Sequence, residues 1–373
     1  MQTRNTSAFW TKPAAAWQGE EVGLICCEVR QETHDVKSFF FTAADGSQFH
    51  FSPGQFITLE LAIGGETISR CYTISSSPTR PHSISITVKR HPNGIVSNWL
   101  HDNINIGSTI AAFGPNGEFT TADLKAEKYL FLSAGSGVTP LMSMTRAFHE
   151  LAENQDVVFI HSARSPDDII FRKELDLIAF NQPKFHAAYI CEQLEDALRS
   201  AYLLAGRLTL EALTQLAPDF KSREIFTCGP APYMAAVRGV LGAAGFNMAH
   251  YHEESFSFDD LPNSVQAAET AAKPTSSPKS ASSQGGAAFS VQFTKSERTL
   301  DCGANEFVLD VAKNAGLRLP FACSKGVCGT CKSKLLSGKV DMKHGGGIRQ
   351  REIDAGMILI CCSKPLSDLV VEK

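Results

Sequence analysis

Three closely spaced cysteines constrain this chain more than any other feature of its sequence. The stretch FACSKGVCGTCKSKL contains Cys323, Cys328 and Cys331 in a C-x4-C-x2-C arrangement. The N-terminal region has no continuous apolar segment of the kind found in secretory signals, so we expect an intracellular, cytoplasmic protein. In that compartment clustered thiols more often bind a metal or carry out redox chemistry than form disulfides. The spacing therefore predicts a metal or redox centre held by cysteine.

A fourth cysteine further along the chain completes a possible ligand set. Cys361 and Cys362 lie in the apolar stretch GMILICCSKP. C-x4-C-x2-C followed by a distant fourth cysteine is a [2Fe–2S] spacing, in which four thiolates converge on two irons. Gly326 and Gly329 would let the loop wrap around the cluster with backbone N–H groups directed at sulfur. A zinc site, which would more naturally show two C-x2-C pairs, and thiols without a metal remain alternatives.

The sequence around these cysteines reads as strand, turn, strand, helix and loop. Apolar residues alternate from Phe289 to Phe293, and they recur at helical spacing from Val308 to Ala315. This layout resembles a plant-type ferredoxin domain of the β-grasp, α+β class, which we expect over residues 288–373. In those ferredoxins the fourth ligand follows a Leu-x pair, which ILICC matches at Cys361. The resemblance therefore implies Cys361 as the fourth ligand.

The segment that precedes this domain is rich in Ser, Ala, Pro, Gly and Lys and has almost no large apolar side chain. Such a composition cannot bury enough surface to offset the entropy of ordering. We therefore expect a flexible linker over residues 258–287.

Three motifs in the first third of the chain carry a resemblance to a known superfamily. SRCYTISSSP contains Arg70, Tyr72 and Thr73, and GIVSNWL places Gly94 and Ser97 at the start of a predicted helix. A helix N-terminus can bind a pyrophosphate. By itself the R-x-Y-T motif fits an ordinary strand. Together with the later AFGPNGEF turn, the motifs resemble the ferredoxin–NADP reductase superfamily.

This resemblance implies a role for each motif residue. The arginine would contact a flavin phosphate, the tyrosine would pack on the isoalloxazine, and the threonine hydroxyl would bond near the flavin N5 atom. The resemblance thus implies an antiparallel β-barrel that binds FAD over residues 21–123.

A glycine-containing turn follows the next predicted strand. KYLFLSAGSGVTPLMSM places Gly135, Gly137 and Thr139 between an apolar strand and a helix. Glycines at such a turn let the backbone approach a pyrophosphate closely. The spacing matches the G-x-G-x-T-P of the same superfamily. A serine hydrolase elbow would need glycine where the chain has Ala134. We expect an α/β parallel-sheet domain that binds NADH over residues 124–257.

Two later stretches fit the same nicotinamide domain. EIFTCGPAPYM contains Cys228, Gly229 and Pro230, and the resemblance implies that this thiol lies beside the nicotinamide and flavin N5. An ordinary buried cysteine at a strand end is the alternative. Phe256 in YHEESF resembles the aromatic residue that covers the flavin. The resemblance thus makes Cys228, Phe256 and Thr73 the candidates for hydride transfer.

The coenzyme is expected to be NADH rather than NADPH. Arg164 and the segment to Phe171 would flank the adenosine. Asp167 and Asp168 in SARSPDD would repel a 2′-phosphate.

The order of the motifs resembles flavin reductases with a C-terminal ferredoxin domain. The stretches YTISSSP, VSNWLHDN, IHSARSPDDII, CGPAPYM, YHEESF and CCS are most similar to the reductase components of glycine betaine monooxygenases, which are Rieske-type systems. Hybrid-cluster-protein reductases share the layout and are the nearest alternative. The resemblance implies an NADH-dependent oxidoreductase that passes electrons from NADH through FAD and [2Fe–2S] to a partner oxygenase.

A redox-sensing module without turnover and a zinc-stabilised binding protein remain alternatives of a different class. An absorption spectrum separates them, because the sensor would lack a hydride site and the zinc protein would be colourless. The chain has no apolar run of about 18 residues, as a membrane span needs. Its formal net charge is −4. We therefore expect neither a membrane nor a nucleic-acid partner.

Overall fold

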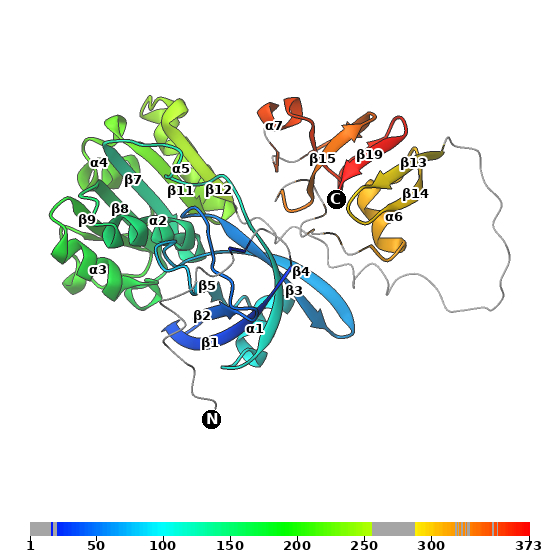
Figure 1. The fold of residues 1–373 in the computed structure, drawn as a ribbon. Helices are drawn as coiled ribbons and strands as arrows, with labels where there is room; N and C mark the ends of the chain where they lie inside the picture. Colours follow the sequence, from blue (N-terminus) through cyan, green and yellow to red (C-terminus); the bar gives the residue numbers. More distant parts are fainter. Residues whose placement is uncertain are drawn as a thin grey trace, which may run out of the picture. The chain divides into compact units, whose positions relative to one another are not determined.

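A computed structural model describes residues 16–17, 21–255, 288–317, 319, 321, 324, 326, 329–344, 347–348 and 350–373 (Figure 1). The chain divides into two compact units, Met1–Phe256 and Ser257–Lys373, called here the first and the second unit. The predicted linker, residues 258–287, lies outside the described residues, as do the three predicted site residues Phe256, Cys323 and Cys328.

The first unit begins with a six-stranded antiparallel sheet in the order β4-β3-β6-β1-β2-β5. A bridge between Ile74 and Ile86 joins its two edges, as expected for a closed barrel. One helix follows β5. The elements are β1 (Val22–Thr33), β2 (Val36–Ala43), β3 (Phe56–Ile63), β4 (Glu66–Thr73), β5 (Ile84–Lys89), α1 (Ile95–Asn103) and β6 (Thr109–Asn116).

A parallel sheet in the order β10-β9-β8-β7-β11-β12 forms the rest of this unit. Its strands are β7 (Lys128–Ala134), β8 (Asp156–Ala163), β9 (Phe185–Cys191), β10 (Leu203–Ala205), β11 (Glu224–Gly229) and β12 (Tyr251–Ser255). Its α-helices are α2 (Val138–Glu150), α3 (Arg172–Asn181), α4 (Leu210–Leu216) and α5 (Ala231–Ala243). Short 3₁₀ turns are η2 (Gly135–Gly137), η3 (Pro166–Asp168), η4 (Asp196–Leu198), η5 (Phe220–Ser222) and η6 (Met248–His250).

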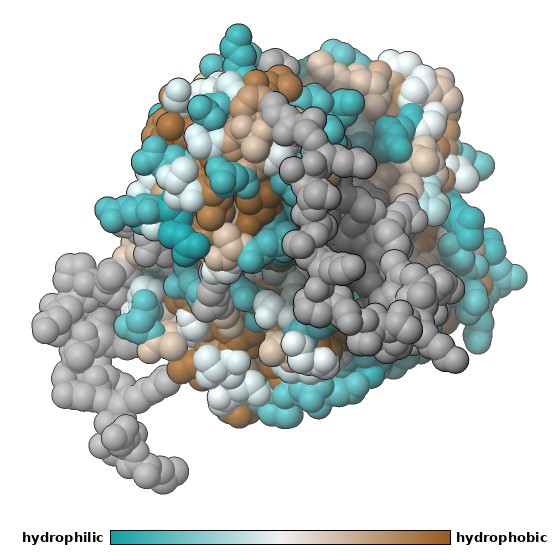
Figure 2. All heavy atoms as spheres, turned by 90° about the vertical axis from the view of Figure 1, so that its right-hand side faces the viewer, coloured by the Kyte–Doolittle hydropathy of each residue, from teal (hydrophilic) through white to brown (hydrophobic). Residues whose placement is uncertain are grey.

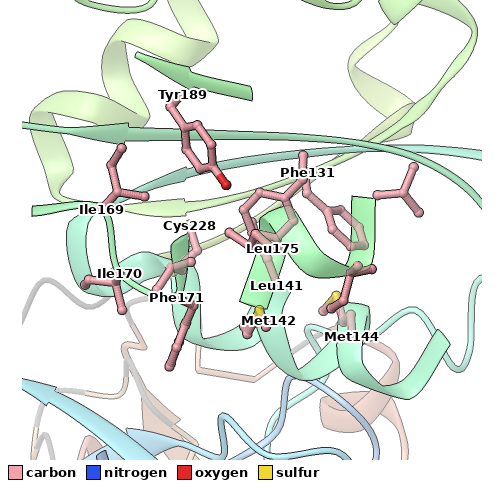
Figure 3. Close-up of a cluster of buried hydrophobic side chains, with 14 of the residues drawn as sticks. Phe131, Leu141, Met142, Met144, Ile169, Ile170, Phe171, Leu175, Tyr189 and Cys228 are labelled. Atoms are coloured by element: carbon pink, nitrogen blue, oxygen red, sulfur yellow. The ribbon is translucent and has the colours of Figure 1, made fainter. Parts of the chain in front are cut away.

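Side chains on both faces of the parallel sheet are buried, which explains the near-continuous apolar runs in its strands. On one face, Phe131 packs in a cluster with Leu141 of α2 and Leu175 of α3 (Figure 3). Phe159 of β8 belongs to the same cluster. On the other, neighbouring strand residues such as Leu132 pack with side chains of α4 and α5. The helices thus form a layer on each face, as the α/β prediction requires.

Hydrogen bonds join the barrel to the parallel-sheet lobe directly after β4. Arg146 of α2 donates from Nη1 to the carbonyl oxygen of Ser75 at 2.5 Å. Ser143 donates to the carbonyl oxygen of Ser76 at 2.7 Å. Arg146 is itself held by Glu174 of α3, with Nη2 to Oε2 at 2.7 Å. The strand that carries the R-x-Y-T motif is therefore tied to the first helix of the lobe.

The second unit contains a five-stranded mixed sheet in the order β14-β13-β19-β15-β17. A two-stranded sheet of β16 and β18 accompanies it. The elements are β13 (Ala288–Phe293), β14 (Arg298–Gly303), α6 (Val308–Asn314), β15 (Lys332–Ser337), β16 (Val340–Met342), α7 (Gln350–Asp354), β17 (Met357–Leu359), β18 (Ser363–Pro365) and β19 (Leu369–Glu372). The predicted order of strand, turn, strand and helix is present, with Val291, Phe293 and Leu309 in the core.

The described surface mixes polar and apolar side chains. On the face shown in Figure 2, hydrophobic side chains lie in several small areas between hydrophilic ones. Within the described residues, no helix has the length and apolar character that crossing a membrane requires.

Candidate functional site

The R-x-Y-T residues lie at the end of β4, as the sequence predicts. Arg70 donates from Nη1 to the carbonyl oxygen of Ser69 at 2.9 Å, and no carboxylate among the described residues pairs with it. Burial raises the pKa of Tyr72, so its phenol stays neutral. The Thr73 hydroxyl is buried and has no hydrogen-bond partner in the described part of the chain. A cation free for a phosphate and an unsatisfied hydroxyl are the groups that a flavin would use.

Gly94 caps the N-terminus of α1. A Cβ at Gly94 would lie 2.4 Å from the Ser97 hydroxyl, so a larger residue would displace that side chain. The hydroxyl accepts the His91 N–H at 3.2 Å, and Asn98 Nδ2 donates to the Gly94 carbonyl at 2.7 Å. No side chain caps the helix and its first turn has no acidic residue. Ser97 thus shapes the turn, and the uncapped N–H groups suit a pyrophosphate.

The G-x-G-x-T-P turn forms η2 and the start of α2. Gly135 has a φ of +53°, a conformation that favours glycine. Thr139 donates its hydroxyl to the Ser136 carbonyl at 3.1 Å, which closes the turn. The helix begins at Val138, so Pro140 lies within its first turn rather than at the first helical position. The missing N–H of Pro140 costs nothing there, because first-turn N–H groups have no intrahelical partner.

The C-G-P motif meets this turn across the sheet. A Cβ at Gly137 would lie 2.3 Å from the carbonyl oxygen of Cys228. At Gly229 it would lie 3.4 Å from the backbone nitrogen of Ala134, at the end of β7, and 2.8 Å from Tyr233 Cδ1. Pro230 precedes α5 and occupies its N-cap position. Two glycines from distant motifs therefore allow backbone segments to approach each other at the carboxyl ends of β7 and β11.

The Cys228 side chain is fully buried at this point. Burial raises its pKa well above the ordinary value, so the group is a neutral thiol rather than a thiolate. A neutral buried thiol is a poor nucleophile. The expected role, to pack beside the nicotinamide, is consistent with this state, whereas covalent catalysis is not.

Glu254 was not predicted as a site residue, yet it lies directly opposite Cys228 on β12. Its Oε2 atom is buried and has no partner among the described residues. Burial raises the pKa of Glu254 to about 8, so the carboxyl is mostly protonated at neutral pH. Its neighbour Glu253 instead pairs with Arg238 at 2.7 Å. Strand alternation indicates that one of the two acids faces inward, but not which one.

Arg164 lies at the end of β8, where the adenosine is expected. Its Nη2 atom is 2.8 Å from Asp168 Oδ1 and 3.2 Å from Asp35 Oδ2, in the β1–β2 turn of the barrel. Lys89 of β5 is 3.0 Å from the same Asp35 oxygen. Hydrogen bonds from Ser165 and Arg164 lower the pKa of Asp168, and Asp168 in turn raises the pKa of Arg164. The charge on Arg164 is therefore balanced by two acids.

Two of the four predicted cluster ligands lie within the described residues. Cys331 and Cys361 are almost completely buried. Lys332 pairs with Leu359 across β15 and β17, so the register brings the residues next to them, Cys331 and Ile360, to one end of the sheet. Gly326 donates its N–H to Cys361 Sγ at 3.3 Å. A backbone amide directed at a buried thiol fits a cysteine-bound cluster.

Comparison with protein families assigns three parts of the chain to three domain families. The model of the oxidoreductase FAD-binding domain matches residues 25–121, and that of the oxidoreductase NAD-binding domain matches residues 131–239. The model of the 2Fe-2S iron-sulfur cluster binding domain matches residues 291–366. These matches confirm the three predicted cofactors, FAD, NADH and [2Fe–2S]. They do not support the zinc-stabilised alternative.

Whole-length relatives give the same assignment. The glycine betaine monooxygenase reductase subunit of Chromohalobacter salexigens is 44% identical over 356 residues, which is 95% of this chain and 96% of that one. The subunit of the same description from Pseudomonas aeruginosa is 45% identical over 359 residues, with the same coverage. The stachydrine N-demethylase reductase subunit of Rhizobium meliloti is 38% identical and covers 97% of this chain and 99% of its own.

A solved structure of phthalate dioxygenase reductase has the same fold. It matches with a TM-score of 0.57 and 23% identity over 95% of this chain and 98% of its own. The fold class predicted from the sequence is therefore confirmed. From the identity over nearly its whole length, the chain belongs to the family of the glycine betaine monooxygenase reductase subunits, which are NADH-dependent oxidoreductases with FAD-binding, NAD-binding and 2Fe-2S domains.

Proposed function

We propose that this protein is the reductase component of a Rieske-type oxygenase that demethylates glycine betaine. The observation that carries the proposal is the identity of 44 to 45% with glycine betaine monooxygenase reductase subunits over 95% of the chain. The partner is the oxygenase component, which accepts the electrons, and the site of action is the cytoplasm. A reductase of hybrid-cluster protein is the alternative that the experiment below separates.

The proposal gives each predicted residue a task. Arg70 and the uncapped start of α1 bind the FAD phosphates, and Tyr72 packs on the ring. Gly135, Gly137 and Thr139 receive the NADH pyrophosphate, and Arg164 flanks the adenosine. The remaining FAD and NADH contacts fall to Thr73, Gly94, Ser97, Gly229 and Pro230. The cluster ligands are Cys323, Cys328, Cys331 and Cys361.

The chain's own residues mainly position and enclose the reactants. FAD, when bound, would supply the conversion between two-electron hydride chemistry and one-electron transfer, which matches the one-electron capacity of a [2Fe–2S] cluster. Cys228, Thr73 and Phe256 hold the nicotinamide against the flavin. Positioning of this kind can account for much of the acceleration, because reacting atoms must lie about 3 to 3.5 Å apart. Glu254, mostly protonated, keeps a full negative charge out of this enclosure.

Anaerobic titration with NADH followed by mixing with acceptors tests the function. The purified protein should show flavin and [2Fe–2S] absorption that NADH bleaches. The Rieske-type oxygenase of glycine betaine, supplied with its substrate, should restore the absorption within the time of turnover. Rapid reoxidation by hybrid-cluster protein, with none by the oxygenase, would overturn the proposal in favour of the alternative.

A further inference from the structure

The sulfur of Cys362 lies against the backbone of Gly326, in the loop expected to surround the cluster. A Cβ placed on Gly326 would be 2.7 Å from Cys362 Sγ and 3.0 Å from the Cα atom of His344. Gly326 also has a φ of +69°, which glycine adopts readily and other residues rarely do. Cys362 and His344 therefore confine Gly326 from two sides.

Gly326 in turn donates its N–H to the sulfur of Cys361, at 3.3 Å. Two consecutive cysteines thus act on the same residue in different ways. Cys361 accepts the hydrogen bond, and Cys362 limits where the donor can lie. The Gly326 carbonyl is fixed as well, because it accepts the Gly347 N–H at 2.9 Å.

Cys362 is itself held in place, so its sulfur can limit the position of Gly326. It is buried, with 7% of its surface exposed. Its thiol donates to the Leu359 carbonyl at 3.5 Å, and its backbone N–H donates to the same oxygen at 3.1 Å. Its own carbonyl accepts the Lys343 N–H at 3.2 Å. The backbone of Cys362 is thus held by two hydrogen bonds and its buried thiol by a third, which limits how far the sulfur can move when the neighbouring loop shifts.

We propose that Cys362 is a positioning residue for the iron–sulfur site, and not one of its ligands. Its thiol holds Gly326 so that the amide N–H points at Cys361, and it thereby contributes to the reduction potential of the cluster. The inference rests on the proposed ligand role of Cys361. Hydrogen bonds to ligating sulfur tune the potentials of such clusters, because they stabilise the more negative, reduced state.

The size of the side chain at position 362 should therefore set the potential. Cys362→Ala removes the sulfur atom that limits the position of Gly326, so the Gly326 backbone should move away from Cys361. In Cys362→Val the added methyl group pushes the same backbone outward. Both changes should shift the midpoint potential of the cluster to more negative values. Cys362→Ser, which is close in shape and keeps a donor for Leu359, should stay near the wild-type value.

The measurement uses the full chain with FAD and cluster in place. Midpoint potentials come from optical titration with mediator dyes, and iron content and visible circular dichroism report whether the cluster remains. Cys302→Ala is the matched control. Cys302 is a fully buried cysteine of the same unit, on β14, whose thiol lies near the Gly303 and Glu306 carbonyls. This control should leave the potential unchanged.

A double-mutant cycle gives a second and independent readout. Gly326→Ala alone should reduce cluster content, because its Cβ would meet the Cys362 sulfur. Combining it with Cys362→Ala removes that clash, so the double variant should retain more cluster than the sum of the single effects allows. Strict additivity would contradict direct coupling between the two positions.

Two further outcomes would overturn the proposal. The first is a wild-type potential in both Cys362→Ala and Cys362→Val. The second is loss of the cluster in Cys362→Ser with retention in Cys361→Ser, which would make Cys362 the ligand. None of these measurements includes an oxygenase. A failure of the glycine betaine monooxygenase assignment would therefore leave the potentials interpretable, and the two failures can be told apart.

Discussion

Gly137 and Cys228 lie so close together at the carboxyl ends of β7 and β11 that no side chain fits between them. A Cβ on Gly137 would lie 2.3 Å from the Cys228 carbonyl oxygen and 2.5 Å from the Gly229 nitrogen. Both obstacles are backbone atoms, which cannot rotate away as a flexible side chain can. The turn expected to bind the pyrophosphate and the strand end expected to contact the nicotinamide are therefore positioned by one contact.

Gly137→Ala should separate these two segments and slow the reduction of the flavin by NADH. A displacement of about 1 Å can reduce a rate by about 100-fold, and we expect a loss of that order in stopped-flow measurements. Gly239→Ala is the control, because nothing lies within 4 Å of a Cβ at this exposed position of α5. It should keep the rate and stabilise the helix by about 0.5 to 1 kcal/mol. Equal rates in both variants would contradict the close approach.

The ion pairs of Arg164 predict how coenzyme preference can be changed. The wild type should prefer NADH, because Arg164 at the expected adenosine position already pairs with Asp168 and Asp35, and Asp35 also pairs with Lys89. Asp168→Asn removes one of these partners, and kcat/KM for NADPH should rise about tenfold relative to that for NADH. The free energy that corresponds to this tenfold change is at the lower end for a charge-assisted hydrogen bond, because the Arg164 side chain is 56% exposed to solvent. Asp167→Asn removes an exposed acid of the same segment but no ion pair of Arg164, so it should change the ratio much less than Asp168→Asn does.

Loss of one cluster ligand should leave the flavin half of the protein active. Cys331→Ser should abolish the [2Fe–2S] absorption while FAD and NADH-driven reduction of ferricyanide remain. The reason is that the chain divides into two compact units, and the four proposed cluster ligands all belong to the second unit. Iron analysis and dye-reduction rates check this result. A folded variant that no longer reduces the dye would show that the two redox centres are not separable.

Lysines near the cluster should steer the encounter with the oxygenase. Lys343 is exposed and its N–H donates to the Cys362 carbonyl, so it lies beside the cluster loop. Lys332 directly follows Cys331, but Glu352 pairs with it and balances its charge, so we expect Lys332 to contribute less to this steering than Lys343 does. Lys343→Glu should slow electron transfer to the oxygenase, and the effect should diminish with added salt, since the Debye length is about 8 Å at physiological ionic strength.

Lys339→Glu is the matched control, because Lys339 is an exposed lysine beyond the other end of β15. Reduction of a small dye by NADH should be unchanged in both variants. Rates to the oxygenase that depend neither on salt nor on the charge at position 343 would indicate docking through apolar contacts.

His161 predicts the acid sensitivity of the parallel-sheet lobe. It is completely buried and its Nδ1 is 2.7 Å from the Ser133 hydroxyl, and burial lowers its pKa to about 3. The unfolded chain binds a proton at this residue below about pH 6.5, whereas the folded lobe does not. As the pH decreases from about 6.5 to about 3, this residue should therefore lower the free energy of unfolding by about 1.4 kcal/mol for each pH unit.

Urea unfolding followed by circular dichroism between pH 6.5 and 4.5 measures this slope. His161→Gln should lower the stability at neutral pH but give a shallower dependence on pH, because one titrating group is lost. His186→Gln replaces an exposed histidine of β9 and should keep the slope of the wild type. An unchanged slope in His161→Gln would contradict the depressed pKa.

The sequence predicted those features that depend on short stretches of chain. The turn at Gly135–Gly137, the strand that ends in Thr73 and the alternation from Phe289 each follow from local pattern and conformation. The pairing of Arg164 with Asp35 could not be predicted, because it joins segments more than a hundred residues apart. The inward position of Glu254 was likewise hidden, since alternation leaves two equivalent choices until the register is known.

The hydrogen bonds from α2 to the segment after β4 have a consequence for exchanging parts between related reductases. Arg146 and Ser143 bind carbonyl oxygens of the barrel, and Arg164 reaches the β1–β2 turn. A chimera that replaced the parallel-sheet lobe alone would have to recreate all three contacts with a foreign barrel. The barrel and lobe should therefore be exchanged together, whereas the iron–sulfur unit can be exchanged at the boundary after Phe256 without cutting any of these bonds.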